Sequence, residues 1–260
     1  MKYQVLGPLR IASEDGSPSL VSPRERALVA VLLVFAGRWC SRELLLHAVW
    51  GARQPANPSA ALRLCVWRAS RALGGGCLEN LNGAARAGAG KPPARAFRAV
   101  LAPGDLDLHR FRAERKAAGR LLEQDDLVAA SEALERALDC WRDPPLDDLP
   151  DVPEVAAERA GLLEDRRLTW LTYADTMLRR GAQDQILPQL HARVITDPRC
   201  QPSWEQLVRA LHQSGRPSEA LEFYSKARLE LVQNFGTEPG AEFRDTLGLV
   251  EASAPAPGGR

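Results

Sequence analysis

Apolar and polar residues follow two different spacings along the 260 residues of the chain. Near the start, short apolar runs at 3–6 and 9–11 are separated by a Gly-Pro break, which predicts short strands. From Ser22 onward, apolar residues recur at helical spacing, apart from loops rich in glycine and proline. The longest apolar run, Ala27–Ala36, has ten residues. A membrane span needs roughly 20, so this run predicts a buried helix.

The first helix has a clear start signal. Ser22 is a candidate N-cap, Pro23 occupies the first helical position, and Glu25 completes the Ser-x-x-Glu spacing of a capping box. We expect this helix to run through the apolar stretch and to end at Gly37.

Two more helices follow in the front part of the chain. Ser41 predicts the N-cap of a second helix that ends at Gly51, and a third helix is predicted from about Ser59 to Leu73. Residues 96–101 predict a strand within the Gly/Ala/Pro/Arg-rich segment that comes next. Three helices between an N-terminal sheet and a C-terminal hairpin predict a winged helix-turn-helix.

The third helix has two chemically different faces. Its apolar stripe, at spacing i, i+4, i+7 and i+11, consists of Leu62, Val66, Ala69 and Leu73. Its opposite side carries Arg63, Trp67, Ser70 and Arg71, with Arg68 at the margin. A recognition helix keeps one face on the core and presents donors to base edges and phosphates on the other. The alternative is a basic face that is only solvated.

The chain from Asp105 onward is predicted to be helical and contains a 34-residue repeat. The repeat relates Trp170 to Trp204, Gly181 to Gly215, Leu187 to Leu221, and Leu190 to Tyr224. The second copy keeps the tetratricopeptide spacing, and one such helix pair cannot bury its apolar face alone, so stacked neighbours are expected. The alternative is a set of helical hairpins without true repeat geometry.

The net charge of +1 is the sum of two unlike parts. Residues 1–104 carry 14 basic and 5 acidic side chains, whereas residues 105–260 carry 20 basic and 28 acidic ones. The length also fits two domains. We therefore predict an α+β winged-helix DNA-binding domain at 1–104 and an all-α, tetratricopeptide-like domain at 105–250. Residues 251–260, rich in Ala, Pro and Gly, predict a disordered tail.

Signals for an enzyme or a metal site are weak. The four histidines are scattered without metal-ligand spacing, and Gly90-Lys91 is followed by Pro92 where a phosphate loop has Ser or Thr. The five cysteines form no Cys-x-x-Cys, and the N-terminus lacks the apolar block of a signal peptide. We expect reduced thiols in a cytoplasmic protein with no enzymatic activity, no metal and no cofactor.

Other basic residues of the front domain extend the candidate DNA-binding surface. Near helix N-termini, where donors can hold phosphate, lie Arg24, Arg26 and Arg42. The predicted wing carries Arg86, Lys91, Arg95 and Arg98, which suit backbone phosphate or the minor groove. The basic balance of the whole domain favours DNA over a surface that is merely solvated.

Several motifs together resemble the Streptomyces antibiotic regulatory proteins. In the front part these are Val5-Leu6-Gly7-Pro8-Leu9, Pro23-Arg24-x-Arg26-Ala27-Leu28, Ala48-Val49-Trp50-Gly51 and Val66-Trp67-Arg68 with Ala72-Leu73-Gly74. In the back part they are Asp105-Leu106-Asp107-Leu108-x-x-Phe111, Trp141-Arg142-x-Pro144-Pro145-Leu146 and Ser214-Gly215-Arg216 with Glu219-Ala220-Leu221. The resemblance covers almost the whole chain.

The resemblance implies an OmpR-like winged helix joined to a bacterial transcriptional activation domain. It implies binding to direct repeats in double-stranded promoter DNA of biosynthetic clusters, with two protomers side by side, and recruitment of RNA polymerase with its sigma factor. Trp67 and Ser70 stand where the family motif usually has Ser and Arg, and Ala96-Phe97 stand where Gly-Tyr is usual. We therefore expect a different base preference. The chain resembles the small members that lack a nucleotide-hydrolysing module.

The sequence patterns predict a cytoplasmic DNA-binding protein, and the family resemblance implies a nucleoid-associated activator of antibiotic biosynthesis. Arg63, Trp67, Arg68 and Arg71 are expected to enter the major groove. The alternative is a tetratricopeptide-type interaction scaffold, or a ligand-responsive regulator, whose front domain does not bind DNA.

Overall fold

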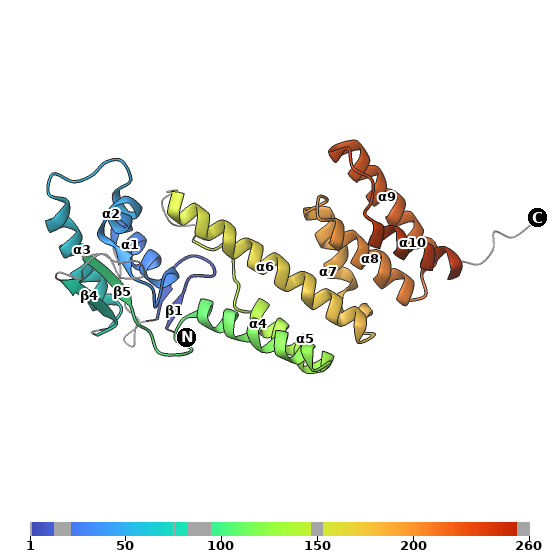
Figure 1. Cartoon of the computed structure of the whole chain (residues 1–260), viewed down its shortest axis with the longest axis horizontal. Helices are drawn as coiled ribbons and strands as arrows, with labels where there is room; N and C mark the ends of the chain where they lie inside the picture. The colour runs from blue at the N-terminus through green and yellow to red at the C-terminus, as the bar shows by residue number, and fades with distance from the viewer. Residues whose placement is uncertain (1, 13–21, 75, 83–94, 147–152, 254–260) are drawn as a thin grey trace, which may run out of the picture. The chain divides into compact units, whose positions relative to one another are not determined.

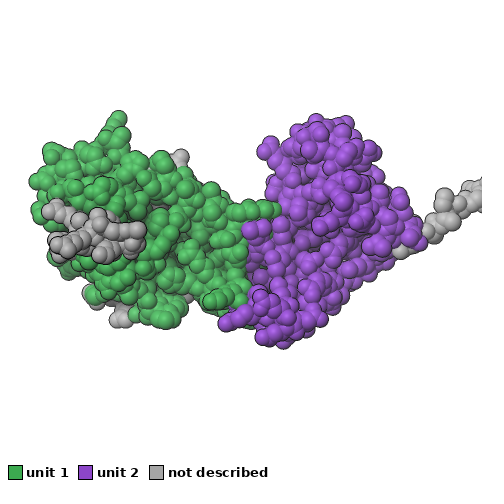
Figure 2. All heavy atoms as spheres, in the orientation of Figure 1, with its two compact units in different colours: residues 1–116, 136–167 green, residues 117–135, 168–260 purple. Residues whose placement is uncertain are grey.

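A computed structural model describes most of the chain (Figure 1). The described residues are 2–12, 22–74, 76–82, 95–146 and 153–253. They are mostly helical, with a small amount of sheet within residues 3–99. They divide into two compact units (Figure 2). The first unit comprises residues 1–116 and 136–167, and the second comprises residues 117–135 and 168–260.

The first unit begins with two short antiparallel strands. Strand β1 (Tyr3–Gln4) pairs with β2 (Arg10–Ile11), in agreement with the short strands predicted there. Helix α1 (Pro23–Val34) follows, and the Ser22 hydroxyl caps it by accepting the N–H of Arg24 at 3.3 Å. The buried helix predicted for the apolar run is confirmed from Ala27 to Val34, all of which are buried, but it ends at Val34 and not at the predicted Gly37.

Two further helices pack against α1. The Ser41 hydroxyl caps α2 (Arg42–Trp50) by accepting the N–H of Leu44 at 3.1 Å, as predicted. Helix α3 (Pro58–Ala72) begins just before the predicted Ser59, because the side chain of Asn57 caps it. Both α2 and α3 contact α1.

A three-stranded antiparallel sheet completes this part of the first unit. Its order is β3 (Cys40–Ser41), β5 (Arg95–Ala99) and β4 (Leu78–Asn82). Phe97 on the central strand lies opposite both Cys40 and Asn80. The strand predicted at 96–101 is thus present with shifted ends. The residues that link β4 to β5, including Arg86 and Lys91, lie outside the described residues.

The core of the first unit continues beyond the predicted domain boundary at 104/105. Helices α4 (Asp107–Glu123), α5 (Leu127–Leu138) and α6 (Pro153–Arg179) follow. Buried side chains from this stretch pack with those of the front helices in one cluster, among them Leu106, Leu108, Phe111, Trp141, Leu146, Val155 and Leu162. The compact units therefore divide at a different place from the predicted domains, because these apolar side chains complete the front core.

In the second unit, four further helices pack so that each contacts the next one along the chain. These are α7 (Gln183–Thr196), α8 (Gln201–Gln213), α9 (Pro217–Phe235) and α10 (Ala241–Ser253). Trp170 and Trp204, the first positions of the 34-residue repeat, are both buried. Gly181 and Gly215 adopt left-handed φ values of 73° and 72° at equivalent helix–helix turns, a conformation that favours glycine.

The C-terminal helix is longer than the sequence predicts. Helix α10 extends to Ser253, so the first three residues of the predicted tail, 251–253, are helical. The side chain of Val250 is buried and holds this last turn against the unit. The rest of the predicted tail, 254–260, lies outside the described residues.

Candidate nucleic-acid interface

The two predicted faces of α3 are present in the structure. Leu62, Ala69 and Leu73 are buried, and Val66 is half-buried and packs against the same core. On the other face, Arg63, Trp67 and Arg71 are exposed and Ser70 is half-buried. The Trp67 side chain is 56% exposed, and the Arg71 guanidinium carbon lies 5.2 Å from the centre of its ring system. The outer face of α3 therefore presents cations around an aromatic surface.

Arg68 is held by a carboxylate from another helix. Its Nη1 donates to Oε1 of Glu25 on α1 at 2.8 Å. The Glu25 residue is 7% exposed, whereas the Arg68 side chain is 51% exposed. The pair thus joins a buried acid to an arginine at the edge of the outer face.

The arginines near helix N-termini differ in their surroundings. Arg24 is exposed at the start of α1. Arg26 donates to the carbonyl oxygen of Leu9 at 3.1 Å, and Arg42 donates to the hydroxyl of Ser59 at 2.7 Å. Arg26 and Arg42 therefore hold neighbouring segments together, while Arg24 lies at the surface.

The predicted wing residues are described in part. Arg98 on β5 donates from Nε to the Glu79 carboxylate on β4 at 3.0 Å, and its guanidinium lies 4.5 Å from the centre of the Trp39 ring system. The backbone of Arg95 lies in β5. Lys91 lies outside the described residues. Arg98 is thus bound to the hairpin that carries it.

Three partners in this region were not predicted from the sequence. Local spacing assigns Glu25 to a capping box, whereas its carboxylate pairs with Arg68 in the structure, and no local pattern singles out Glu79 or Trp39. An acidic residue in the first turn of a helix whose later positions are all apolar is a usable signal, since a buried carboxylate needs a partner. The identity of that partner, 43 residues away, depends on the tertiary fold.

The cysteine on α3 is a structural thiol. Burial raises the pKa of Cys65, and the Glu25 carboxylate raises it further, against the opposing charges of Arg68 and Arg24. The thiol is therefore protonated near neutral pH and is a poor nucleophile. All five cysteines carry free thiols.

Neither a metal cluster nor a membrane helix is found among the described residues. Within them, no group of three or more His, Cys, Asp and Glu side chains is placed to hold a metal ion. The helices of the same residues are too short or too polar to cross a bilayer.

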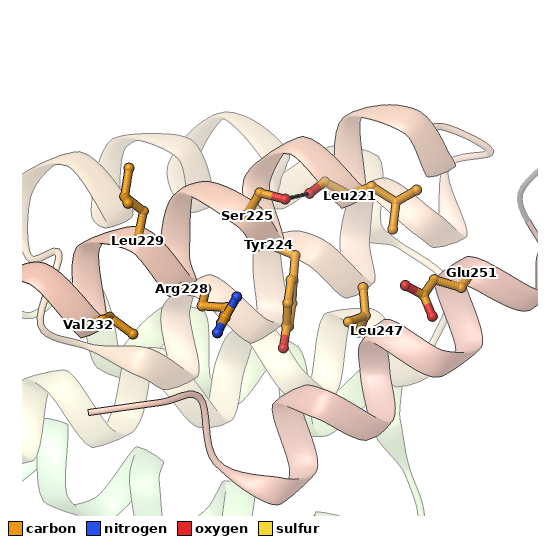
Figure 3. A pocket seen from close by; sticks show the side chains of 8 residues that line it. All are labelled: Leu221, Tyr224, Ser225, Arg228, Leu229, Val232, Leu247 and Glu251. Carbon is orange, nitrogen blue, oxygen red and sulfur yellow. Dashed lines mark hydrogen bonds between the residues drawn. The ribbon is translucent and has the colours of Figure 1, made fainter. Parts of the chain in front are cut away.

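The second unit contains a cavity between α9 and α10, with a volume of about 390 Å³ (Figure 3). It is lined by Leu221, Tyr224, Ser225, Arg228, Leu229, Val232, Leu247 and Glu251. The hydroxyl of Ser225 donates to the carbonyl oxygen of Leu221 at 2.9 Å, and Arg228 binds Glu238 through two nitrogens at 2.7 and 2.8 Å. The walls of the cavity are therefore mainly apolar, and two of its polar side chains, Ser225 and Arg228, already form hydrogen bonds within the protein.

Comparison with known proteins agrees with the resemblance seen in the motifs. Residues 106–247 match the family model described as bacterial transcriptional activator domain. The transcriptional regulatory protein EmbR of Mycobacterium tuberculosis is 30% identical over 94% of this chain and 61% of its own length. The chain thus spans less than two thirds of that relative. The transcriptional regulator RedD of Streptomyces coelicolor is 32% identical over 98% of this chain and 71% of its own.

A solved structure is also similar. It is EmbR of Mycobacterium tuberculosis in complex with a low-affinity phosphopeptide, with a TM-score of 0.85 and 28% identity, covering 98% of this chain and 65% of that one. The matched family segment contributes to both compact units, since α4 begins in the first. The chain therefore belongs to the bacterial transcriptional activator domain family and, with these relatives, to the Streptomyces antibiotic regulatory proteins, a group of transcriptional regulators.

Proposed function

We propose that the chain is a sequence-specific DNA-binding activator of transcription. In this proposal the front of the first unit is a winged helix-turn-helix, with α2 and α3 as the helix-turn-helix and the β4–β5 hairpin as the wing. Helix α3 enters the major groove, which is wide enough to admit a helix. The elements supporting this assignment are three helices packed together and a hairpin joined to the sheet.

The observation that carries the proposal is the outer face of α3. A tryptophan that is 56% exposed lies among Arg63 and Arg71, and Leu64 nearby is 49% exposed. Apolar surface of this kind commonly marks an interaction site. Because the front 104 residues carry a net charge of +9, the partner that fits best is a polyanion.

The remaining basic residues divide into two groups in this proposal. Arg24, Lys91 and Arg95 bind backbone phosphates and so set the position of α3 on the duplex. Arg26, Arg42 and Arg98 first hold the protein elements that carry them, and any contact they make with phosphate is secondary to that role. Ser70 contributes a hydroxyl at the edge of the same face.

The helical second unit supplies the contacts that turn DNA binding into activation. We assign to it a tetratricopeptide-like fold, supported by the equivalent turns at Gly181 and Gly215. By analogy with the family, two protomers bind direct repeats upstream of biosynthetic promoters and recruit RNA polymerase with its sigma factor. The protein then acts at the nucleoid in the cytoplasm and has no enzymatic role.

Binding of the full chain to promoter duplexes tests the proposal. Arg63→Ala and Arg71→Ala should each weaken binding, and removal of one arginine–phosphate bond should reduce the slope of log K against log salt by about 0.9. Arg112→Ala, which removes an exposed cation on α4, is the matched control and should leave the affinity of the chain for the promoter duplex unchanged. Normal affinity in an Arg63→Ala/Arg71→Ala double variant would exclude α3 as the DNA-binding helix.

Run-off transcription with RNA polymerase holoenzyme tests activation separately. The full chain should raise transcript yield from a promoter that carries its binding site. A tetratricopeptide-type scaffold or ligand-responsive regulator without DNA affinity, the rival function, predicts no retardation of any duplex at low salt and no effect on yield.

A further inference from the structure

Glu25 is a buried acid at the start of helix α1, whose later positions are apolar. It is 7% exposed at the first turn of α1, and the residues from Ala27 to Val34 that follow it are all buried. A buried carboxylate is stable only when it is paired or hydrogen-bonded. Its ion-pair partner is Arg68 of α3, at 2.8 Å.

Arg68 uses only one corner of its guanidinium for this contact. Nη1 donates to Glu25, and within the described residues no hydrogen bond to protein is made by Nε or Nη2. Half of the side chain, 51%, is exposed. By contrast, Arg98 directs both Nε and Nη2 to Glu79 and lies over the ring of Trp39. Arg68 is thus anchored on one side and open on the other.

An anchored arginine on a recognition helix is suited to reading a base. Free arginine loses much rotamer freedom when it binds, and a side chain already held in one orientation loses less. Its planar fork can still donate two parallel hydrogen bonds, the pattern that O6 and N7 of guanine accept in the major groove. A lysine in the same place would offer one ammonium group without that geometry.

We propose that Glu25 is a positioning residue that orients Arg68 to read one base pair, a guanine in the major groove. This inference rests on the proposed function, because it requires α3 to enter the groove. Glu25 itself does not touch DNA. It sets sequence preference through Arg68, whereas the exposed Arg63 and Arg71 supply affinity that depends less on sequence.

Selection from a random duplex library tests this role. The full chain, Glu25→Gln, Arg68→Lys and the control Glu158→Gln each select from a library with about 20 random base pairs, a length that covers two turns of B-DNA. The control removes the same charge from an Arg38–Glu158 pair of 3.0 Å in the same unit, between residues that belong to neither α1 nor α3. In both Glu25→Gln and Arg68→Lys, the preference for guanine should fall at the same single base pair. A good bidentate contact corresponds to roughly 5- to 150-fold discrimination.

The pattern of change separates the possible outcomes. Binding to unselected duplexes should stay within about twofold of wild type in Arg68→Lys, which keeps the charge and the partner of Glu25. A uniform fall in preference at all positions, or full preference retained in Glu25→Gln, overturns the role of Glu25. A wild-type chain that selects no sequence overturns the proposed function instead, so the two failures are distinguishable.

Discussion

Both carboxylate oxygens of Asp107 lie 2.9 Å from the backbone nitrogen of Val5. The same carboxylate accepts the N–H groups of Leu6 at 3.0 Å and Leu108 at 2.8 Å, and it is 1% exposed. Asp107 begins α4, within the segment that matches the activator domain family. The first helix of that segment is thus hydrogen-bonded to the N-terminal strand region.

Replacing Asp107 by alanine should destabilise the first unit. The substitution leaves the N–H groups of Val5, Leu6 and Leu108 without their acceptor, and each buried unpaired group costs on the order of 1–3 kcal/mol. We expect a decrease of about 3 kcal/mol in the free energy of unfolding, measured by urea denaturation. Asn57→Ala, which removes an exposed side-chain cap from α3, is the control and should cost about 1 kcal/mol. Equal decreases in the two variants would contradict the importance of the buried network.

A fragment of residues 1–104 should not fold as the full chain does. It lacks apolar side chains that complete the core of the first unit, including Phe111 and Trp141, whose rings meet edge to face at 5.2 Å. In the full chain, Trp141→Ala should reproduce part of this defect, at a cost of about 3–5 kcal/mol. Calorimetry of the fragment should show a weak or absent unfolding transition. A fragment as stable as the first unit of the full chain would support the boundary predicted from the sequence.

Acid should weaken the contact between His47 on α2 and Glu154 on α6, which lie 2.9 Å apart. The hydrogen bond from His47 holds the pKa of Glu154 below its ordinary value of 4.5. Because the folded-state pKa is the lower one, the stabilisation is present above pH 4.5 and is lost as pH falls through the depressed pKa. Both side chains are partly exposed, so the contribution is at most about 1 kcal/mol.

The comparison with Glu154→Gln isolates this effect. The difference in unfolding free energy between wild type and variant should be measurable at about pH 6 and should shrink as the pH falls below the ordinary pKa of 4.5 and through the depressed pKa of Glu154. A difference that stays constant across this acid range would assign the stabilisation to packing and not to the ionised pair.

Local signals in the sequence were sufficient to predict several helices. Ser22 and Ser41 each accept the backbone bond expected of an N-cap, and the two sides of α3 separate buried from exposed residues as its spacing predicts. The spacing of the repeat also agrees with the structure at Gly181 and Gly215, which both adopt left-handed backbone conformations. Helix caps, apolar stripes and turns depend on residues only a few positions apart, so they can be predicted from the sequence.

Contacts between distant residues could not be predicted in this way. The charge composition of the chain changes near residue 104. The apolar core does not end there, because Leu106, Leu108 and Trp141 are buried with the front helices. Similarly, helix spacing places Arg68 at the margin of a basic face, while its bond to Glu25 arises only when α1 and α3 pack together. The use of the face for DNA stays a prediction.

Two tryptophans with opposite burial should separate folding from binding. Trp204 on α8 is 7% exposed and donates from its indole nitrogen to the carbonyl oxygen of Pro198 at 3.0 Å. Trp204→Ala should lower the unfolding free energy of the second unit by about 3–5 kcal/mol. The exposed Trp67 on α3 should behave differently, with a change within about 0.5 kcal/mol in Trp67→Ala.

DNA binding should respond in the reverse order. At about 25 °C, Trp204→Ala should bind promoter duplex within about twofold of wild type, because Trp204 does not belong to the core of the first unit. Trp67→Ala should bind at least about fivefold more weakly, since an interaction worth about 1 kcal/mol or more is removed from the groove. Calorimetry and fluorescence anisotropy on the same samples check both halves. A single transition that shifts as a whole in Trp204→Ala, with a parallel decrease in binding, would show that the two units unfold together.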